Sequence, residues 1–325
     1  MPMRSREEVG MLKEKWRVYM AKYILKRCVS IIITLFLVCT ITFIMMKAVP
    51  GGPFTTEKKL PPKVLASLEK KYHLDDPLWK QYVDYVKGAA TFDFGPSFKK
   101  DGVMVSDMIA QSFPVSAKLG LVALAIVIAL GIPFGIIAAL KQNKLPDYVT
   151  TVFATLGIAI PTFVLGTVIL YVFGAKLGWI PTHGLDSWKC YIGPSISLAG
   201  FSLAYVLRLT RSSMLSVCGQ DYIRTARAKG LPERKVIFKH ALKNAMIPVV
   251  TYIGPMTAGI MVGSFVTEKI YAIPGMGKLF VEAINNRDYT VIMGTTMLYA
   301  AMAAIMILAV DIAYAFLDPR IKFQD

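Results

Sequence analysis

The sequence predicts an all-α polytopic membrane protein with six transmembrane helices and both termini in the cytoplasm. Hydrophobic residues make up 55% of the 325 residues, charged residues only 18%, and the mean hydropathy is +0.52. A soluble domain carries about 45–50% apolar and roughly 25% charged residues. Apolar runs of about 20 residues, long enough to cross ~30 Å of hydrocarbon as a helix, recur along the chain. The composition therefore excludes a disordered chain and a disulfide-stabilised secreted domain.

The first half of the chain predicts a basic N-terminal segment, a span and a long outer loop. Residues 1–27 carry eight Lys and Arg, and no signal-peptide cleavage pattern precedes the apolar run 28–49. That run is too long for the apolar core of a signal peptide, so we expect it to stay in the membrane. In the loop 50–112, Pro61 and Pro62 are followed by a pattern that predicts a short amphipathic helix over 63–72.

The remaining apolar runs define five further spans. A short loop with two lysines joins the second to the third, and a longer basic loop, 211–246, joins the fourth to the fifth. The fourth is the shortest and is closed by Arg208 and Arg211, so a re-entrant segment is an alternative for it. The predicted transmembrane helices are 28–49, 113–140, 147–173, 195–210, 247–268 and 291–317.

The distribution of Lys and Arg predicts the orientation. With the N-terminus inside, the inner segments hold 21 basic and 8 acidic residues, and the outer segments hold 16 and 12. Basic residues favour the cytoplasmic side, and a long outer loop counts little in this bias. The net charge of +16 is spread over the loops beside the spans. We therefore expect anionic membrane lipid, and no nucleic acid, as the partner of this charge. The inner segments are 1–27, 141–147, 208–246 and 317–325.

The chain lacks the motifs of nucleotide and metal sites. No G-x-x-x-x-G-K-[ST] pattern occurs, because the nearest Gly-Lys pair, Gly277–Lys278, is followed by Leu279. His73, His183 and His240 are isolated from one another and from any cysteine pair. We therefore expect no cofactor or metal bound by this chain and no enzymatic activity of its own.

The inner loop carries the most informative pattern. Its segment 221–244 reads as two short helices joined at Gly230, with Asp221 expected to cap the first. Gly230 suits the left-handed residue that ends a helix, and Pro232 suits the first turn of the next. These residues at the helix starts and ends predict an ordered projection. It either anchors the two neighbouring spans or docks a soluble partner.

This loop resembles the EAA loop of ATP-binding-cassette importer permeases, in the form used by the oligopeptide, dipeptide and nickel branch. Arg224 stands where the general EAA pattern has a glutamate, and Gly52 replaces the aspartate of a Pro-Gly-Asp-Pro turn. Because both carboxylates are missing here, no functional role is inferred for either position. The resemblance covers residues 20–325. Matching segments follow in order: YILKR at 23–27, VPGGP at 49–53, FDFG at 92–95, GWIP at 178–181, IPGMG at 273–277, RDY at 287–289 and LDPR at 317–320.

The resemblance implies a type I importer permease fold, with 28–325 as the transmembrane domain, in the cell membrane of a bacterium or archaeon. The implied partners are a second homologous permease, two cytoplasmic ATPases that bind ATP and magnesium, and an extracytoplasmic peptide-binding protein. The outer loop 50–112 would contact that binding protein or form a lid. The implied substrates are di- and oligopeptides, with nickel chelates or another small solute as the alternative.

The resemblance also places ATPase coupling on the inner loop, whereas residues of the substrate pathway stay unassigned. Glycine and threonine in the third and fifth spans are more typical of helix packing than of a substrate site. The residues expected to serve coupling are Asp221, Tyr222, Arg224, Thr225, Ala226, Arg227, Ala228, Lys229 and Gly230.

Two other classes compete with this interpretation. An ion-coupled secondary transporter needs carboxylates near mid-membrane, but Asp311 lies near the inner end of the sixth span. A non-transporting membrane scaffold is the second, because an ordered inner loop can bind any soluble partner.

Overall fold

The computed structural model describes residues 6–54 and 61–317, and this part of the chain folds into helices with no β-strand. Within it, five helical segments are long and apolar enough to cross a membrane, and a bent pair of helices brings the number to six. The five are Lys22–Ala48, Val105–Leu140, Trp188–Cys218, Glu233–Ile270 and Tyr289–Ala309. Residues 318–325 of the expected inner segment 317–325, with most of the LDPR motif, lie outside the described residues, as do residues 1–5 and 55–60.

The first span is part of one long helix. Helix α1 (Arg6–Ala48) begins within the predicted N-terminal segment 1–27 and continues without a break to the end of the predicted span but for its last residue. The outer loop that follows contains α2 (Pro62–Lys71), close to the predicted amphipathic helix, and α3 (Leu78–Thr91). The second span is α4 (Val105–Ile126), the π-helical turn η1 (Val127–Gly131) and α5 (Ile132–Leu140).

The predicted third span, 147–173, is not a straight helix. It is divided into α6 (Leu145–Ala159) and α7 (Thr162–Ile169), which continues as η2 (Leu170–Lys176), and the two parts are bent by 106°. The break falls at Pro161, and Ile160 before it is extended, with φ −81° and ψ 120°. Proline disfavours the helical conformation of the preceding residue, which explains the break.

Helix α8 (Ile192–Cys218), preceded by the 3-10 turn η3 (Trp188–Tyr191), is the centre of the fold. It packs against α4, α5, α6, α7 and α11 (Leu242–Met261). In its most apolar window 56% of the residues are buried, compared with 6% for α1. The prediction of 195–210 for this span was too short. Arg211 does not end the helix, because the carboxylate of Asp147 on α6 pairs with it.

Five shorter elements, the span α11 and a last span complete the described part of the chain. After α8 come α9 (Asp221–Ala228), α10 (Glu233–Lys235) and the π-helical turn η4 (Val236–Ala241), which leads into α11. Beyond α11 lie α12 (Phe265–Ile270), α13 (Met276–Asn286) and the final span α14 (Tyr289–Leu317). Helix α14 packs between α1 and α11.

A buried carboxylate explains the IPGMG motif between α12 and α13. Glu268 is fully buried, accepts a hydrogen bond from Ser116 Oγ at 2.7 Å and accepts another from the backbone N–H of Lys278 at 2.8 Å. Ser116 Oγ in turn accepts the N–H of Met276 at 2.8 Å. A Cβ on Gly275 would lie 2.4 Å from the Glu268 carboxyl carbon. The first turn of α13 is therefore tied to α4, and glycine leaves room for the tie.

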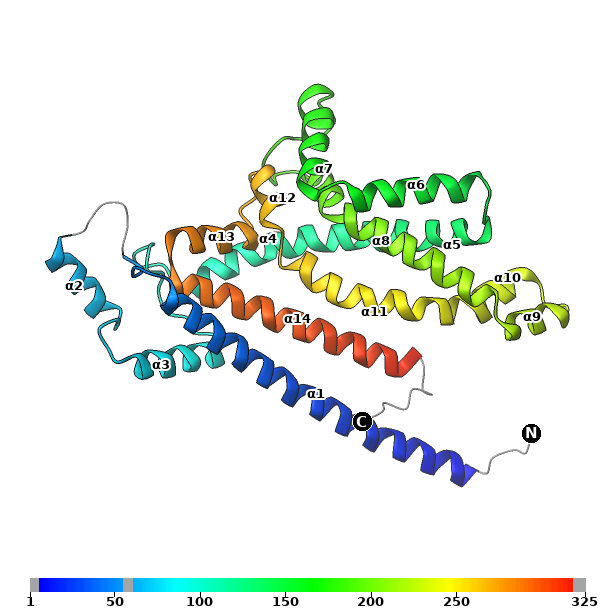
Figure 1. The fold of residues 1–325 in the computed structure, drawn as a ribbon, viewed down its shortest axis with the longest axis horizontal. Coiled ribbons are helices and arrows are strands. Elements are labelled where there is room, and N and C mark those ends of the chain that lie inside the picture. Colours follow the sequence, from blue (N-terminus) through cyan, green and yellow to red (C-terminus); the bar gives the residue numbers. More distant parts are fainter. Residues whose placement is uncertain (1–5, 55–60, 318–325) are drawn as a thin grey trace.

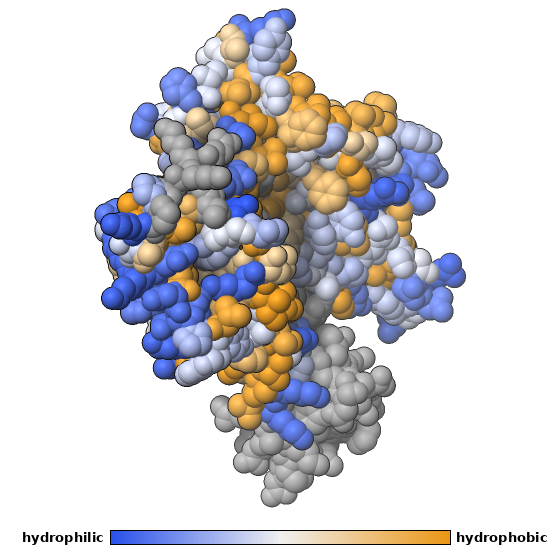
Figure 2. All heavy atoms as spheres, turned by 60° about the vertical axis from the view of Figure 1, so that its left-hand side comes forward, coloured by the Kyte–Doolittle hydropathy of each residue, from blue (hydrophilic) through white to orange (hydrophobic). Residues whose placement is uncertain are grey.

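The two ends of the molecule differ in character. Figure 1 shows α9 and α10 at one end of the long axis, the end at which α1 begins, and α2 and α3 at the opposite end. Figure 2 shows hydrophilic side chains gathered on the α2–α3 end that comes forward there, with apolar side chains on the parts beside it. The assignment of the α9 end to the cytoplasm stays a prediction from the charge bias.

Candidate functional site

Helix α9 follows α8 after a tight turn and ends where the sequence predicts. Gly230 has a left-handed backbone, with φ 73°, which explains the glycine after the last turn. The expected cap at Asp221 is wrong. The residue before the helix is Gln220, without a side-chain capping bond, and Asp221 is the first helical residue. Its carboxylate lies 3.8 Å from Arg224 instead, one turn along the helix. A carboxylate in the first turn still complements the helix dipole.

One face of α9 is buried against the protein's own core. Ile223 is fully buried and Ala226 is 7% exposed. The expectation that Ala226 contacts an ATPase therefore needs correction, because its side chain is covered by this chain itself. The covering is made by the end of α8 and by η4, and the cluster includes Met214, Val236, Ile237, Ala241 and Ala245. This packing fixes α9 to the two long helices on either side of it.

The opposite face of α9 is exposed and held in shape by polar contacts. Arg227 donates two hydrogen bonds to the Glu233 carboxylate, at 3.1 and 2.7 Å, which closes the loop between α9 and α10. Tyr222 Oη accepts a hydrogen bond from the amide of Asn244 on α11 at 2.8 Å. Eight of the nine predicted coupling residues are exposed there, namely Asp221, Tyr222, Arg224, Thr225, Arg227, Ala228, Lys229 and Gly230.

An ion pair beside this loop was missed by the sequence analysis. Asp147, at the start of α6, is 3% exposed, and Arg211 on α8 contacts both of its oxygens, at 2.5 and 2.8 Å. The backbone N–H of Asn143 donates a third bond to this carboxylate at 2.9 Å. The pair joins the loop before α6 to the last turns of α8. The signal available was a carboxylate at the start of one span and an arginine at the end of the next.

A polar exposed face runs along α8 and α11. On α8 the exposed positions recur every three or four residues at Phe201, Tyr205, Arg208, Ser212 and Ser216. On α11 the corresponding exposed residues are Asn244, Pro248, Thr251, Pro255 and Gly259. We call these ten residues, five on each helix, the open face. A helical period of 3.6 residues places each set on one side of its helix.

A groove lies between the two helices along the open face. Its volume is about 410 Å³, and its walls include Tyr205 of α8 and Tyr252 of α11, whose ring centroids are 4.2 Å apart. The remaining lining residues are Leu209, Pro248, Thr251, Pro255 and Met256. Each proline within α11 lacks the backbone N–H that would donate a hydrogen bond to the carbonyl oxygen four residues earlier, so that oxygen has no donor within the helix. The groove thus combines aromatic faces, hydroxyl groups and backbone acceptors, a set that suits an extended polar chain.

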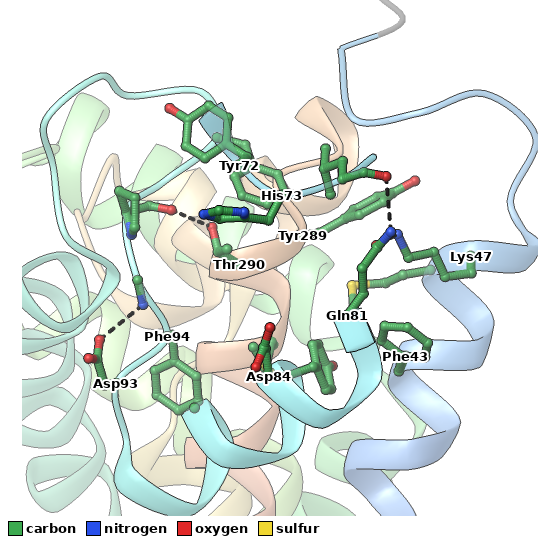
Figure 3. A pocket seen from close by; sticks show the side chains of 18 of the residues that line it. Phe43, Lys47, Tyr72, His73, Gln81, Asp84, Asp93, Phe94, Tyr289 and Thr290 are labelled. Atoms are coloured by element: carbon green, nitrogen blue, oxygen red, sulfur yellow. Dashed lines mark hydrogen bonds between the residues drawn. The ribbon is translucent and has the colours of Figure 1, made fainter. Parts of the chain in front are cut away.

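A second cavity, of about 340 Å³, lies at the α2–α3 end, between the ends of α1 and the start of α14 (Figure 3). In Figure 3, Tyr72 and His73 lie on one side of it and Asp84 and Phe94 on the other. Burial raises the pKa of Tyr85, whose hydroxyl finds no partner among the described residues. On its rim, the hydrogen bond from Lys71 lowers the pKa of Asp101. The described residues hold no group of three His, Cys, Asp or Glu side chains fit for a metal ion.

Comparison with known proteins decides the family. Residues 131–323 match the family described as binding-protein-dependent transport system inner membrane component, and residues 20–120 match the N-terminal family of the same membrane component. The chain belongs to this permease family. The resemblance drawn from the sequence motifs is confirmed, and with it the helical membrane fold in the inner membrane.

Relatives of this permease extend over almost its whole length. It is 50% identical over 305 residues to the dipeptide transport system permease protein DppB of Bacillus subtilis, covering 94% of this chain and 99% of that one. It is 47% identical over 306 residues to the oligopeptide transport system permease protein OppB of Salmonella typhimurium, covering 94% and 100%. An inward-facing structure of the MetNI methionine ABC transporter matches with a TM-score of 0.52 at 13% identity, over 65% of the permease and 96% of that chain. This last likeness supports the fold alone.

Proposed function

We propose that this permease is one of two transmembrane subunits of an ATP-binding-cassette importer for di- and oligopeptides. A second homologous permease would complete the pathway, two cytoplasmic ATPases would bind ATP and magnesium, and an extracytoplasmic binding protein would deliver the peptide. The observation that carries the proposal is identity near one half, over almost the full length, with permeases named for dipeptide and oligopeptide transport.

The geometry of α9 supports its role in coupling. A short helix transmits force only if it cannot shift relative to the spans it drives. Ile223 on its buried face packs against α8 and η4, and Tyr222 is hydrogen-bonded to α11. Its other face is free for an ATPase. Shifting the populations of the inward-open and outward-open conformations from 1:99 to 99:1 requires about 5.5 kcal/mol of differential binding. Nucleotide-driven closure of the ATPases would supply this free energy through α9.

The test of the proposal is reconstitution. The permease, co-expressed with its neighbouring permease and ATPase subunits, is purified and placed in liposomes with the binding protein outside and ATP inside. We expect a labelled dipeptide to accumulate against its gradient only when ATP is hydrolysed. Uphill accumulation by this permease alone, or by the complex without ATP, would contradict the proposal.

A pair of variants tests the coupling surface. Ala228 is exposed on α9, so Ala228→Trp is expected to leave the complex stable in the membrane and to lower peptide uptake at least ten-fold per ATP hydrolysed. Ala90, exposed on α3 at the far end, provides the matched control Ala90→Trp, expected to leave coupling unchanged. Normal uptake per ATP in Ala228→Trp would count against docking on this face. Ala226→Trp is unsuitable as a probe, because overpacking of its buried site disturbs the fold.

A further inference from the structure

Arg208 is a cation inside a membrane helix that lacks a partner in the described part of the chain. It is exposed on α8, in the span Trp188–Cys218, and no carboxylate among residues 6–54 and 61–317 pairs with it. Arg211, one turn further on, differs in this respect because both oxygens of Asp147 contact it. Unpaired charges within spans are costly and mark substrate pathways. The fold thus provides a partner for Arg211, whereas the described residues provide none for Arg208.

We propose that Arg208 binds the carboxylate of the peptide as it crosses, with Tyr205 and Tyr252 beside it forming the apolar wall of the same site. This inference rests on the proposed function and adds a specificity-determining residue to it. The ligand group is a free carboxylate, which every unmodified peptide carries at its C-terminus. Arginine suits it because the planar guanidinium donates two parallel hydrogen bonds to a carboxylate.

The composition of the open face argues against lipid as its environment. It presents hydroxyl, amide and guanidinium groups along α8 and α11, whereas most exposed residues of α1 after Cys28 are apolar, for example Ile33, Leu37 and Ile44. Polar groups in a span face a protein neighbour or a water-filled path, because hydrocarbon leaves them without hydrogen bonds. The open face therefore lines an aqueous route or an interface.

The groove along the open face, lined on α8 by Tyr205 and by Leu209, the residue after Arg208, distinguishes between these two environments. A subunit interface in a membrane is rich in small side chains that let helices approach closely. Ser212, Ser216 and Gly259 of the open face are of this kind, but among the residues that line the groove only Thr251 is. Here Tyr205 remains 38% exposed beside an open groove of about 410 Å³. Aromatic rings with hydroxyl groups accept many side chains by stacking, which suits a passing peptide of variable sequence. None of the ten residues of the open face is acidic, so the field there favours an anionic group.

The groove and Arg208 also lie where movement of α9 would reach them. Tyr205 and Arg208 are one turn apart on α8, which leads into α9, and the opposite wall belongs to α11, which is tied to α9 through Asn244 and Tyr222. Rocking of α9 would change the separation of the two walls. A carboxylate held at Arg208 would then be released when the site opens.

The test is a comparison of two peptides in the complete reconstituted importer. Uptake of radiolabelled trialanine and of trialanine amide is measured for wild type, Arg208→Gln, Arg208→Lys and the control Lys26→Gln, an exposed lysine on α1. We expect Arg208→Gln to reduce the preference for the free acid over the amide about ten-fold, as loss of a charge-assisted hydrogen bond predicts. Arg208→Lys keeps the charge but not the two parallel hydrogen bonds, so it should retain part of the preference, and Lys26→Gln should retain all of it. The binding protein is the same in every measurement, so its own preference between the two peptides cancels when the permease variants are compared.

The outcomes separate this inference from the proposed function. Absence of ATP-driven uptake of either peptide by the wild-type importer would overturn both. If wild type imports peptide and Arg208→Gln lowers the uptake of both peptides equally, Arg208 does not bind the carboxylate. Loss of the second permease, or of bound anionic lipid, from purified Arg208→Gln would assign the guanidinium to that contact and also overturn the inference.

Discussion

The exposed face of α8 and α11 and the exposed face of α6 belong to neighbouring helices, yet only the first carries a charged side chain. On α6 the exposed side chains are mostly apolar, among them Val149, Val152, Phe153 and Leu156, and the polar ones, Tyr148, Thr151 and Thr155, are uncharged. The open face presents Tyr205, Arg208 and Thr251 among its exposed positions, with prolines and serines. Both sets lie in apolar helices, of 15 residues for α6, 27 for α8 and 20 for α11. The difference teaches that hydropathy averaged over a span hides which side of it meets lipid.

The same contrast separates the two arginines of α8. Arg211 points to α6 and is satisfied by Asp147, so it fastens a lipid-facing helix to the central one. Arg208 lies on the open face, where no partner from the described residues reaches it. Identical side chains three residues apart, about 60° from each other around the helix, therefore serve different purposes, because the carboxylate on α6 contacts Arg211 and not Arg208.

The largest effect is expected from a charge placed on each face. Val152→Lys puts an ammonium group against hydrocarbon, which costs about 3 kcal/mol near the middle of a span. Thr251→Lys puts the same group on the open face, where water or a polar partner is available. We expect the amount of full-length permease in the membrane to fall several-fold for the first and to stay near wild type for the second. Equal loss in both would remove the distinction between the faces.

An intermediate effect is expected where the two faces are joined. Asp147→Ala leaves Arg211 partly buried, at 26% exposure, without its carboxylate. We expect a loss of about 2 kcal/mol in stability, less than for a fully buried pair because solvent reaches the guanidinium. The measurement is the thermal unfolding midpoint of the detergent-purified importer. Asp147→Ala with Arg211→Met should recover part of the loss, and Asp221→Ala, which removes an exposed pair, should show none. An unchanged midpoint in Asp147→Ala would contradict the role of the pair.

The smallest perturbation gives the most direct view of the open face. In a permease whose four cysteines are replaced by serine, Thr251→Cys and Val152→Cys are treated with a membrane-impermeant maleimide in inside-out vesicles. Thiol alkylation requires water for the reactive thiolate. We expect Thr251→Cys to react at least several-fold faster, and faster still when ATPase turnover is stopped in the inward-open state. Comparable rates would indicate that α11 faces lipid there.

Several features of the coupling loop follow from local chemistry alone. The end of α9 at Gly230 was predicted because glycine adopts a left-handed backbone without a Cβ clash. Pro232 was predicted in the first turn of the next helix and instead immediately precedes α10, with an extended backbone at ψ 140°. Asp221 was assigned the wrong role by one position, since a capping residue and a first-turn carboxylate share the same preference for the start of a helix.

The sequence by itself determined the membrane class, the helical segments and the loop punctuation, because these depend on apolar length and on residues a few positions apart. Only the tertiary structure decided which side of each helix is covered. It turned Ala226 inward against Met214, paired Arg211 with Asp147, and left Arg208 open. Periodicity shows that a helix has two faces, but the neighbour that buries one of them comes from a distant part of the chain.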